Sequence, residues 1–135
     1  MTDGEVPGEE RDVITKASPR SVADTVSRLT DLVAAKGMKV FAVIDQAAEA
    51  RQVGLDLRPT TLVLFGSPAA GTPVMEAVPL VALDLPLKVL VWQDGDQVKV
   101  SYMAPSALAA RRGLPPDLAQ NLAGIHGLTD ALVVP

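Results

Sequence analysis

Two short apolar runs, residues 61–65 and 87–92, place the strongest constraint on how this chain can fold. Both are rich in valine and leucine, and the first stops abruptly at Gly66. Apolar runs of this length, bounded by turn-forming residues, are typical of strands buried in a sheet. The second run is followed by a Gln-Asp-Gly-Asp turn at 93–96 and by an alternating segment at 97–103, which together predict an antiparallel hairpin.

The segment between these two strands is rich in glycine and proline. Two glycines and Pro68 fall within residues 66–71, so we expect tight turns in a loop there. Thr72 is then expected to cap a short helix that begins at Pro73 and ends before Pro79. A loop that runs from a strand into a helix presents backbone N–H groups that can bind an anion.

The N-terminal part of the domain predicts a strand followed by the longest helix. Residues 13–17 suit a short strand, after which Ser18 is a suitable N-cap and Pro19 a suitable first helical residue. Gly37 is expected to end this helix in the left-handed conformation. The apolar stripe of the helix consists of residues spaced three and four apart: Val22, Val26, Leu29 and Val33.

Residues 38–44 form a nearly continuous apolar run. Such a run predicts a central strand that is buried on most of both faces. Asp45 follows it and is a suitable N-cap for a short helix over 46–53, which Gly54 would close.

The C-terminal third predicts interrupted helices, over 106–112 and 116–123, with Gly124 and Gly127 fraying the end. The complete order is then β-α-β-(α)-β-(α)-β-β-α. This order predicts the α+β class, in which a curved, mainly antiparallel sheet is packed by the long N-terminal helix and a C-terminal helical segment.

The net charge of −4 resides in the first 12 residues, which hold five acids and one arginine. We therefore expect a disordered acidic tail over 1–12 and one neutral domain over 13–135. A neutral domain with four aromatic residues is not typical of nucleic-acid binding. Because the chain starts without the segments of a signal peptide and has no bilayer-length apolar run, we expect a cytoplasmic protein outside the membrane. It has no cysteine, which excludes disulfides and thiolate sites.

Short motifs spread along the chain carry a family resemblance. They are Lys36–Phe41, Ile44–Ala48, Gly54–Pro59, Phe65–Pro68, Gly71–Met75, Asp84–Val89 and Val100–Tyr102. In combination they resemble the bacterial and archaeal Domain of Unknown Function 302 family, over roughly residues 14 to 130. The resemblance implies a β-α-β4-α arrangement similar to the TATA-box-binding-protein-like fold, in a family without an established function. Gln46 and Ser67 stand where that family often has His and Asn, so any metal or proton-transfer role of that His is lost here.

The candidate ligand-binding residues gather around the 66–71 loop and the ends of the strands. The loop lacks the lysine and the spacing of a P-loop, so it is either an anion-binding turn or a purely geometric one. Asp45 and Asp56 could divide acid and base roles, although Asp45 is also explained as a helix cap. The Tyr102 hydroxyl would face either a cavity or a partner in the core. The full set is Asp45, Gly66, Ser67, Gly71, Thr72 and Tyr102.

The sequence offers no catalytic constellation. His126 is the only histidine, and a single histidine without cysteines predicts neither a metal site nor a catalytic triad. No cofactor can be assigned. We therefore expect a small-molecule binding or interaction module, homodimeric because few helices are available to cover its sheet. The alternative is an enzyme of unknown reaction whose pocket lies near residues 66–72.

Overall fold

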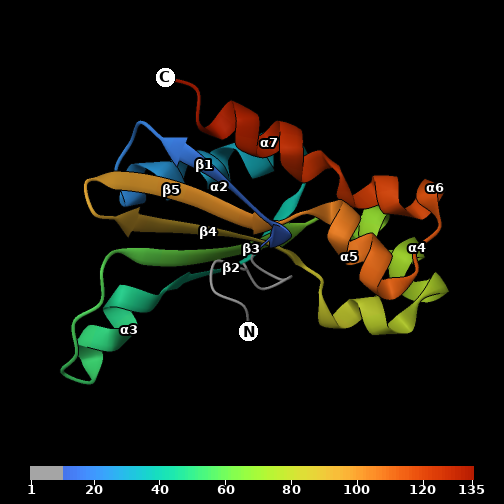
Figure 1. The fold of residues 1–135 in the computed structure, drawn as a ribbon, viewed down its shortest axis with the longest axis horizontal. Coiled ribbons are helices and arrows are strands. Elements are labelled where there is room, and N and C mark those ends of the chain that lie inside the picture. Colours follow the sequence, from blue (N-terminus) through green and yellow to red (C-terminus); the bar gives the residue numbers. More distant parts are fainter. Residues whose placement is uncertain (1–10) are drawn as a thin grey trace, which may run out of the picture.

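The computed structural model describes residues 11–135, and one sheet of five antiparallel strands lies at its centre (Figure 1). The order across the sheet is β1-β5-β4-β3-β2. The strands are β1 (Val13–Ser18), β2 (Lys39–Asp45), β3 (Thr60–Gly66), β4 (Leu87–Asp94) and β5 (Gln97–Met103). Each predicted strand is present, with ends within two residues of those expected. The α+β class with a mainly antiparallel sheet is therefore confirmed.

Helices and 3-10 turns (labelled η) occupy the connections and the C-terminal third. They are α2 (Val22–Ala35), α3 (Gln46–Gln52), α4 (Pro68–Ala77), η1 (Pro79–Leu83), α5 (Pro105–Arg112), α6 (Pro116–Ala119), η2 (Gln120–Leu122) and α7 (Gly124–Leu132). The acidic tail expected over 1–12 lies, except for its last two residues, outside the described part of the chain.

α2 begins three residues later than the sequence predicted. Ser21, not Ser18, is the N-cap, and its Oγ accepts a hydrogen bond of 3.1 Å from the backbone N–H of Asp24. Ser18 still belongs to β1, and its hydroxyl lies 2.7 Å from that of the buried Thr25. The prediction failed because Ser18 and Ser21 are equally suitable N-caps in sequence, and Ser18 is part of the paired strand β1.

The core lies between one face of the sheet and a layer formed by α2 and α7 (Figure 1). Aliphatic side chains dominate it, with Phe65 and Tyr102 as its aromatic members. The buried cluster consists of Val22, Leu29, Val33, Val63, Phe65, Val89, Val91, Val98, Val100, Tyr102, Ile125, Leu128 and Leu132. This arrangement matches the expected packing of a sheet by an N-terminal helix and a C-terminal helical segment.

The prediction of a frayed C-terminus is wrong. Gly124 and Gly127 lie inside α7, a helix of nine residues. Three of its apolar residues, Ile125, Leu128 and Leu132, are almost completely buried in the core. Their spacing of three and four places them on one helix face, and the burial of that face outweighs the low helix propensity of glycine.

The prediction that residues 38–44 form a central strand is also wrong. β2 is the edge strand of the sheet and pairs only with β3 among the described strands. Its pairing register shifts between Val40 and Ala42, and Phe41 and Val43 remain 46% and 48% exposed. The apolar run therefore predicts a strand here, but it does not determine the position of that strand in the sheet.

The burial of α7 makes a direct prediction about stability. Leu128→Ala should lower the free energy of unfolding by about 2–5 kcal/mol, because Leu128 is fully buried between α7 and the sheet. Urea denaturation measures this change. The matched control, Leu80→Ala on the exposed surface of η1, should change the free energy by less than about 0.5 kcal/mol. Equal effects of the two substitutions would contradict this placement of α7.

Candidate functional site

An apolar pocket with a volume of about 300 Å³ lies where one end of the sheet meets α4 and the beginning of α7. Five parts of the chain supply its walls: the start of β2, the end of β3, α4, the connector into β4, and the η2–α7 join. The lining residues are Met38, Phe41, Gly66, Ser67, Pro68, Ala70, Gly71, Met75, Leu85, Pro86, Leu87, Asn121, Leu122, Gly124 and Ile125.

α4 forms one wall because its start differs from the predicted one. The helix begins at Pro68, and the N-cap is Ser67, whose Oγ accepts a hydrogen bond of 3.2 Å from the backbone N–H of Ala70. Thr72 is therefore an interior helical residue, and the predicted loop over 66–71 is largely the first turn of α4. The serine–proline pair determined this start, as a cap followed by proline at the first helical position.

The two glycines of this segment leave space that the pocket uses. A Cβ atom at Gly66 would lie 3.9 Å from Cε2 of Phe41, and one at Gly71 would lie 3.7 Å from the side-chain ends of Leu85 and Met75. These are ordinary contact distances, so an alanine would fit at either position. A larger side chain would have to extend into the pocket.

Among the described residues that line the pocket, none has an ionisable side chain. The polar side chains in the lining are those of Ser67 and Asn121. Ser67 caps α4, and Asn121 donates a hydrogen bond of 3.0 Å to the carbonyl oxygen of Ala70. Both are thus engaged in holding the walls, and the chemistry of the cavity suits an apolar molecule rather than an anion.

The structure brings three of the six candidate residues together. Gly66, Ser67 and Gly71 line the pocket. Asp45 caps α3 as expected, accepting a hydrogen bond of 2.9 Å from Ala48 N, and Thr72 is exposed on α4. Tyr102 lies in the core beneath α7.

Among the described residues, His, Asp and Glu do not gather in any group of three or more that could hold a metal ion.

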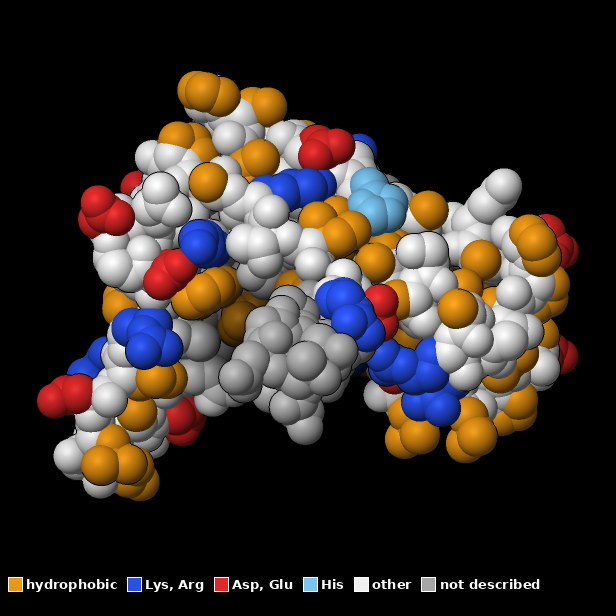
Figure 2. Space-filling model, in the orientation of Figure 1, with side chains coloured by type: hydrophobic (Ala, Val, Ile, Leu, Met, Phe, Trp, Pro, Cys, Tyr) orange, Lys and Arg blue, Asp and Glu red, His pale blue; other side chains and the backbone are white. Residues whose placement is uncertain are grey.

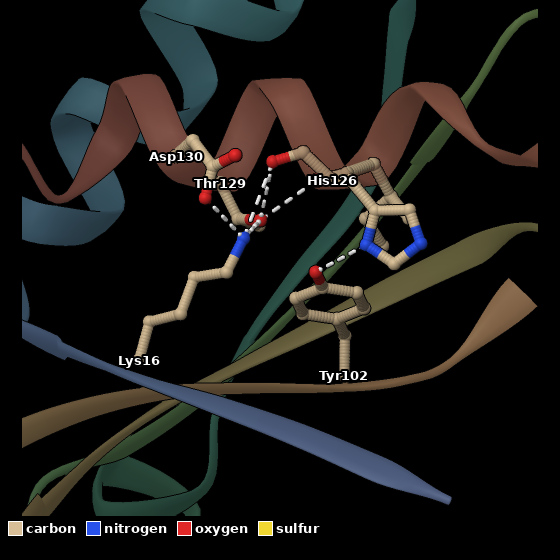
Figure 3. A network of polar contacts seen from close by, with 6 residues as sticks. Lys16, Tyr102, His126, Thr129 and Asp130 are labelled. Carbon is tan, nitrogen blue, oxygen red and sulfur yellow. Dashed lines mark hydrogen bonds and ion pairs between the residues drawn. The ribbon is translucent and has the colours of Figure 1, made fainter.

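A polar network on the inner side of α7 joins residues that the sequence did not connect (Figure 3). The Tyr102 hydroxyl lies 2.8 Å from Nδ1 of His126. Lys16, which comes from β1, donates a hydrogen bond of 2.6 Å to Oγ1 of Thr129 and forms an ion pair of 2.7 Å with Asp130. The network therefore connects one turn of α7, residues 126–130, to strands β1 and β5.

The network also sets the charge state of Lys16. Burial lowers the pKa of this lysine, but the Asp130 carboxylate and Tyr102 more than offset burial, so the pKa is raised above its ordinary value. Lys16 is consequently positively charged in the folded protein near neutral pH. A permanently charged lysine that already has its partners is suited to anchoring a helix, not to accepting protons.

This anchoring bears on the pocket because the helix turn involved forms part of its wall. Ile125 lines the pocket and immediately precedes His126. On another wall, Nε of Arg112 donates a hydrogen bond of 2.6 Å to Oδ2 of Asp84, next to the lining residue Leu85. This contact raises the pKa of Arg112. Polar contacts outside the cavity thus hold apolar walls in place.

The fold and the pocket together define a class of small α+β proteins with one antiparallel sheet, covered by helices on one face. Within that class, the family described as "Domain of unknown function DUF302" matches residues 14–132. The chain belongs to the DUF302 family. A solved structure, of an uncharacterized conserved DUF302 protein from Bacillus stearothermophilus, has the same fold with a TM-score of 0.77. That similarity covers 90% of this chain and 95% of the other, at 22% identity.

Curated relatives are longer than this chain. It is 39% identical over 103 residues to fluoride-specific ion channel FluC 1 of Brucella suis and to FluC 1 of Brucella abortus. The matched region is 76% of this chain but only 41% and 38% of those two proteins. In residues 11–135, no helix combines the length and apolar character needed to span a bilayer.

The Tyr102–His126 contact can be tested by a double-mutant cycle. Tyr102→Phe should cost about 0.5–1.5 kcal/mol of unfolding free energy, because it removes one hydrogen bond beneath α7. Combined with His126→Ala, the loss should be smaller than the sum of the two single losses, since both substitutions remove the same contact. Chemical denaturation of the four proteins measures this coupling. Strict additivity would show that the pair does not interact.

Proposed function

We propose that this protein is a non-catalytic binding module whose ligand is a small, uncharged, apolar molecule held in the pocket between β2, α4 and α7. The observation that carries the proposal is the lining itself, whose described residues surround about 300 Å³ and include no ionisable side chain. An enzyme that used general acid–base chemistry would need a titratable group at its reacting centre. The pocket offers its occupant apolar contact instead.

The volume indicates the size of the ligand. An apolar cavity of about 150 Å³ accommodates benzene, so a cavity of about twice that volume suits a molecule of about ten to twelve non-hydrogen atoms. Phe41 and the thioether side chains of Met38 and Met75 provide polarisable contacts for a flat or aromatic ligand. A bicyclic aromatic hydrocarbon is therefore a suitable chemical probe.

The proposal further holds that the module works as a homodimer. In the described part of the chain, helices cover one face of the sheet and leave the second face without a helical layer. Native mass spectrometry of the purified protein would report the number of subunits and any retained small molecule in one experiment. A dimer that carries an additional mass is the expected result.

Ligand binding is tested with naphthalene and 2-naphthoate, which share a ring system but differ in charge. Naphthalene should shift the backbone amide NMR signals of Gly66, Gly71 and Ile125. 2-Naphthoate should bind at least about tenfold more weakly, because its carboxylate would enter a cavity without a counter-charge. Equal affinity for the two, or no binding of naphthalene, would contradict the proposal.

A matched pair of variants locates the binding. Gly71→Leu should abolish naphthalene binding while the protein stays folded, because the new side chain would fill the cavity. Gly127→Leu makes the same change on the exposed surface of α7, where, apart from the adjacent residues and the backbone of the helix itself, no described atom lies within 4 Å of the added Cβ. The control should bind naphthalene as the unmodified protein does. Retained binding in Gly71→Leu would place the ligand elsewhere.

The names of the curated relatives favour a second candidate function, in the handling of fluoride. Fluoride is a strongly hydrated anion, and transferring it into an uncharged apolar pocket would be costly. The second candidate is therefore an accessory role beside a fluoride channel, not a fluoride site within this pocket. In a ¹⁵N NMR titration, sodium fluoride should shift the signals of the pocket residues no more than sodium chloride does. A saturable, fluoride-specific shift would favour direct binding instead.

A further inference from the structure

The face of the sheet that points away from α2 and α7 carries a continuous apolar patch. In antiparallel pairs, directly opposed residues point to the same side, so the pairing register defines this face. Leu62 opposes Leu90 and Ile44, while Leu64 opposes Ala42. We call this surface the open face, with its centre at Ala42, Ile44, Leu62, Leu64, Leu90 and Trp92. Within residues 11–135, no helix forms a layer over it (Figure 1).

The polar side chains at the centre and border of the open face already have hydrogen-bond partners. Trp92 Nε1 donates a hydrogen bond of 3.0 Å to Oγ of Ser101, which in turn lies 2.8 Å from Oγ1 of Thr15. Lys99 pairs with Asp94, and the Lys88 ammonium donates to two backbone carbonyl oxygens nearby. Among the described residues, a partner would therefore meet an apolar centre bordered by one ion pair and by the hydrogen-bonded Lys88 ammonium.

A second feature is the excursion between β2 and β3, residues 46–59, which we call the α3 arm. It extends to the side of the sheet opposite α7 (Figure 1). Its buried residue is Ala47, whereas Val53, Leu55 and Leu57 are 73%, 63% and 41% exposed. Apolar side chains gather at its free end in Figure 2, at the lower left. A helix of seven residues gains little stability alone in water, so packing of this apolar side would stabilise the arm.

We propose that the open face and the α3 arm are the two halves of one self-complementary interface, in which the arm of each copy packs across the open face of a second copy of this chain. A two-fold axis makes such contacts reciprocal: when the arm of the first copy packs on the face of the second, the arm of the second packs on the face of the first. This inference deepens the homodimer of the proposed function by assigning its surface, and it is independent of the pocket.

The area of the two features fits a dimer. Five strands about 4.8 Å apart and about 20 Å long give the open face a flat area of about 500 Å². A standard stable interface buries about 800 Å² per partner. The open face, whose central residues are half-buried, falls short of that value, and the exposed apolar residues Val53, Leu55 and Leu57 of the α3 arm add area on the same side of the molecule.

Charge favours a second copy over other partners. The described domain from residue 13 onward holds equal numbers of acidic and basic residues, and on the open face Lys99 is paired with Asp94. A strongly acidic or basic partner would find no complementary potential there. The charge of the α3 arm is balanced as well, with Glu49 and Asp56 against Arg51 and Arg58, so a second copy would meet no net charge repulsion.

The single tryptophan of the chain lies on the open face and reports its burial. On dilution from high to low concentration, the fluorescence of Trp92 should shift to longer wavelength as sedimentation velocity shows the dimer dissociating. Leu90→Glu on the face and Val53→Asp on the arm should each raise the dimer dissociation constant at least about tenfold. The control Val134→Asp changes an exposed valine on the layer of α7 and should leave the dimer intact.

Cross-linking tests the arm-to-face geometry directly, because the chain has no cysteine of its own. Protein with Val53→Cys is mixed with protein carrying Leu62→Cys and then oxidised. A disulfide between the two variants should form readily, whereas Val134→Cys mixed with Leu62→Cys should give none.

Three results would overturn the inference. A dimer that is insensitive to both Leu90→Glu and Val53→Asp would place the interface elsewhere and leave the proposed homodimer standing. A monomer at every concentration would refute the homodimer as well. A monomer that dimerises only after removal of residues 1–10 would assign the open face to that segment. Naphthalene binding is measured separately in Leu90→Glu, so failure of the interface and failure of the pocket are distinguishable.

Discussion

The structure depends on the burial of one sheet face beneath two helices that are distant in sequence. α2 follows the first strand and α7 ends the chain, yet their apolar stripes meet over the same valine-rich surface. This contact determines which face of the antiparallel sheet is buried, and it fixes the register of the central strands. It also places the first turn of α7 over one end of the sheet, where that turn becomes a wall of the pocket. Without α7 the pocket would be open on that side.

Local patterns in the sequence were sufficient for most of the fold. The strands, the Asp45 cap, the left-handed Gly37 and the turn around Gly95 were predicted because each depends on residues adjacent in the chain. Two features depended on tertiary packing and were missed. The position of β2 in the sheet is decided by which strands it pairs with, and α7 is stabilised by burial despite its two glycines. Neither is encoded in local propensity.

The site was only partly predictable, for the same reason. Gly66, Ser67 and Gly71 were identified because a glycine–proline segment after a strand stands out in the sequence. The opposite wall, Leu122 and Ile125, comes from a segment more than fifty residues away and carries no motif. The expected chemistry also changed with the start of α4. Once Ser67 is the cap and Thr72 is helical, the segment presents apolar side chains to a cavity instead of backbone N–H groups to an anion.

The pocket and the open face are two separate candidate binding surfaces on one small domain. The pocket lies at one end of the sheet and is held by polar contacts outside it, including the Arg112–Asp84 ion pair. The open face, together with the α3 arm, lies on the side of the sheet away from α7. Because β2 and β3 contribute to both, through Phe41 and Gly66 at one end and Ile44 and Leu62 further along, these strands physically connect them. The register shift of β2 falls between Val40 and Ala42, so this one edge strand supplies a pocket wall at Phe41 and part of the open face at Ile44.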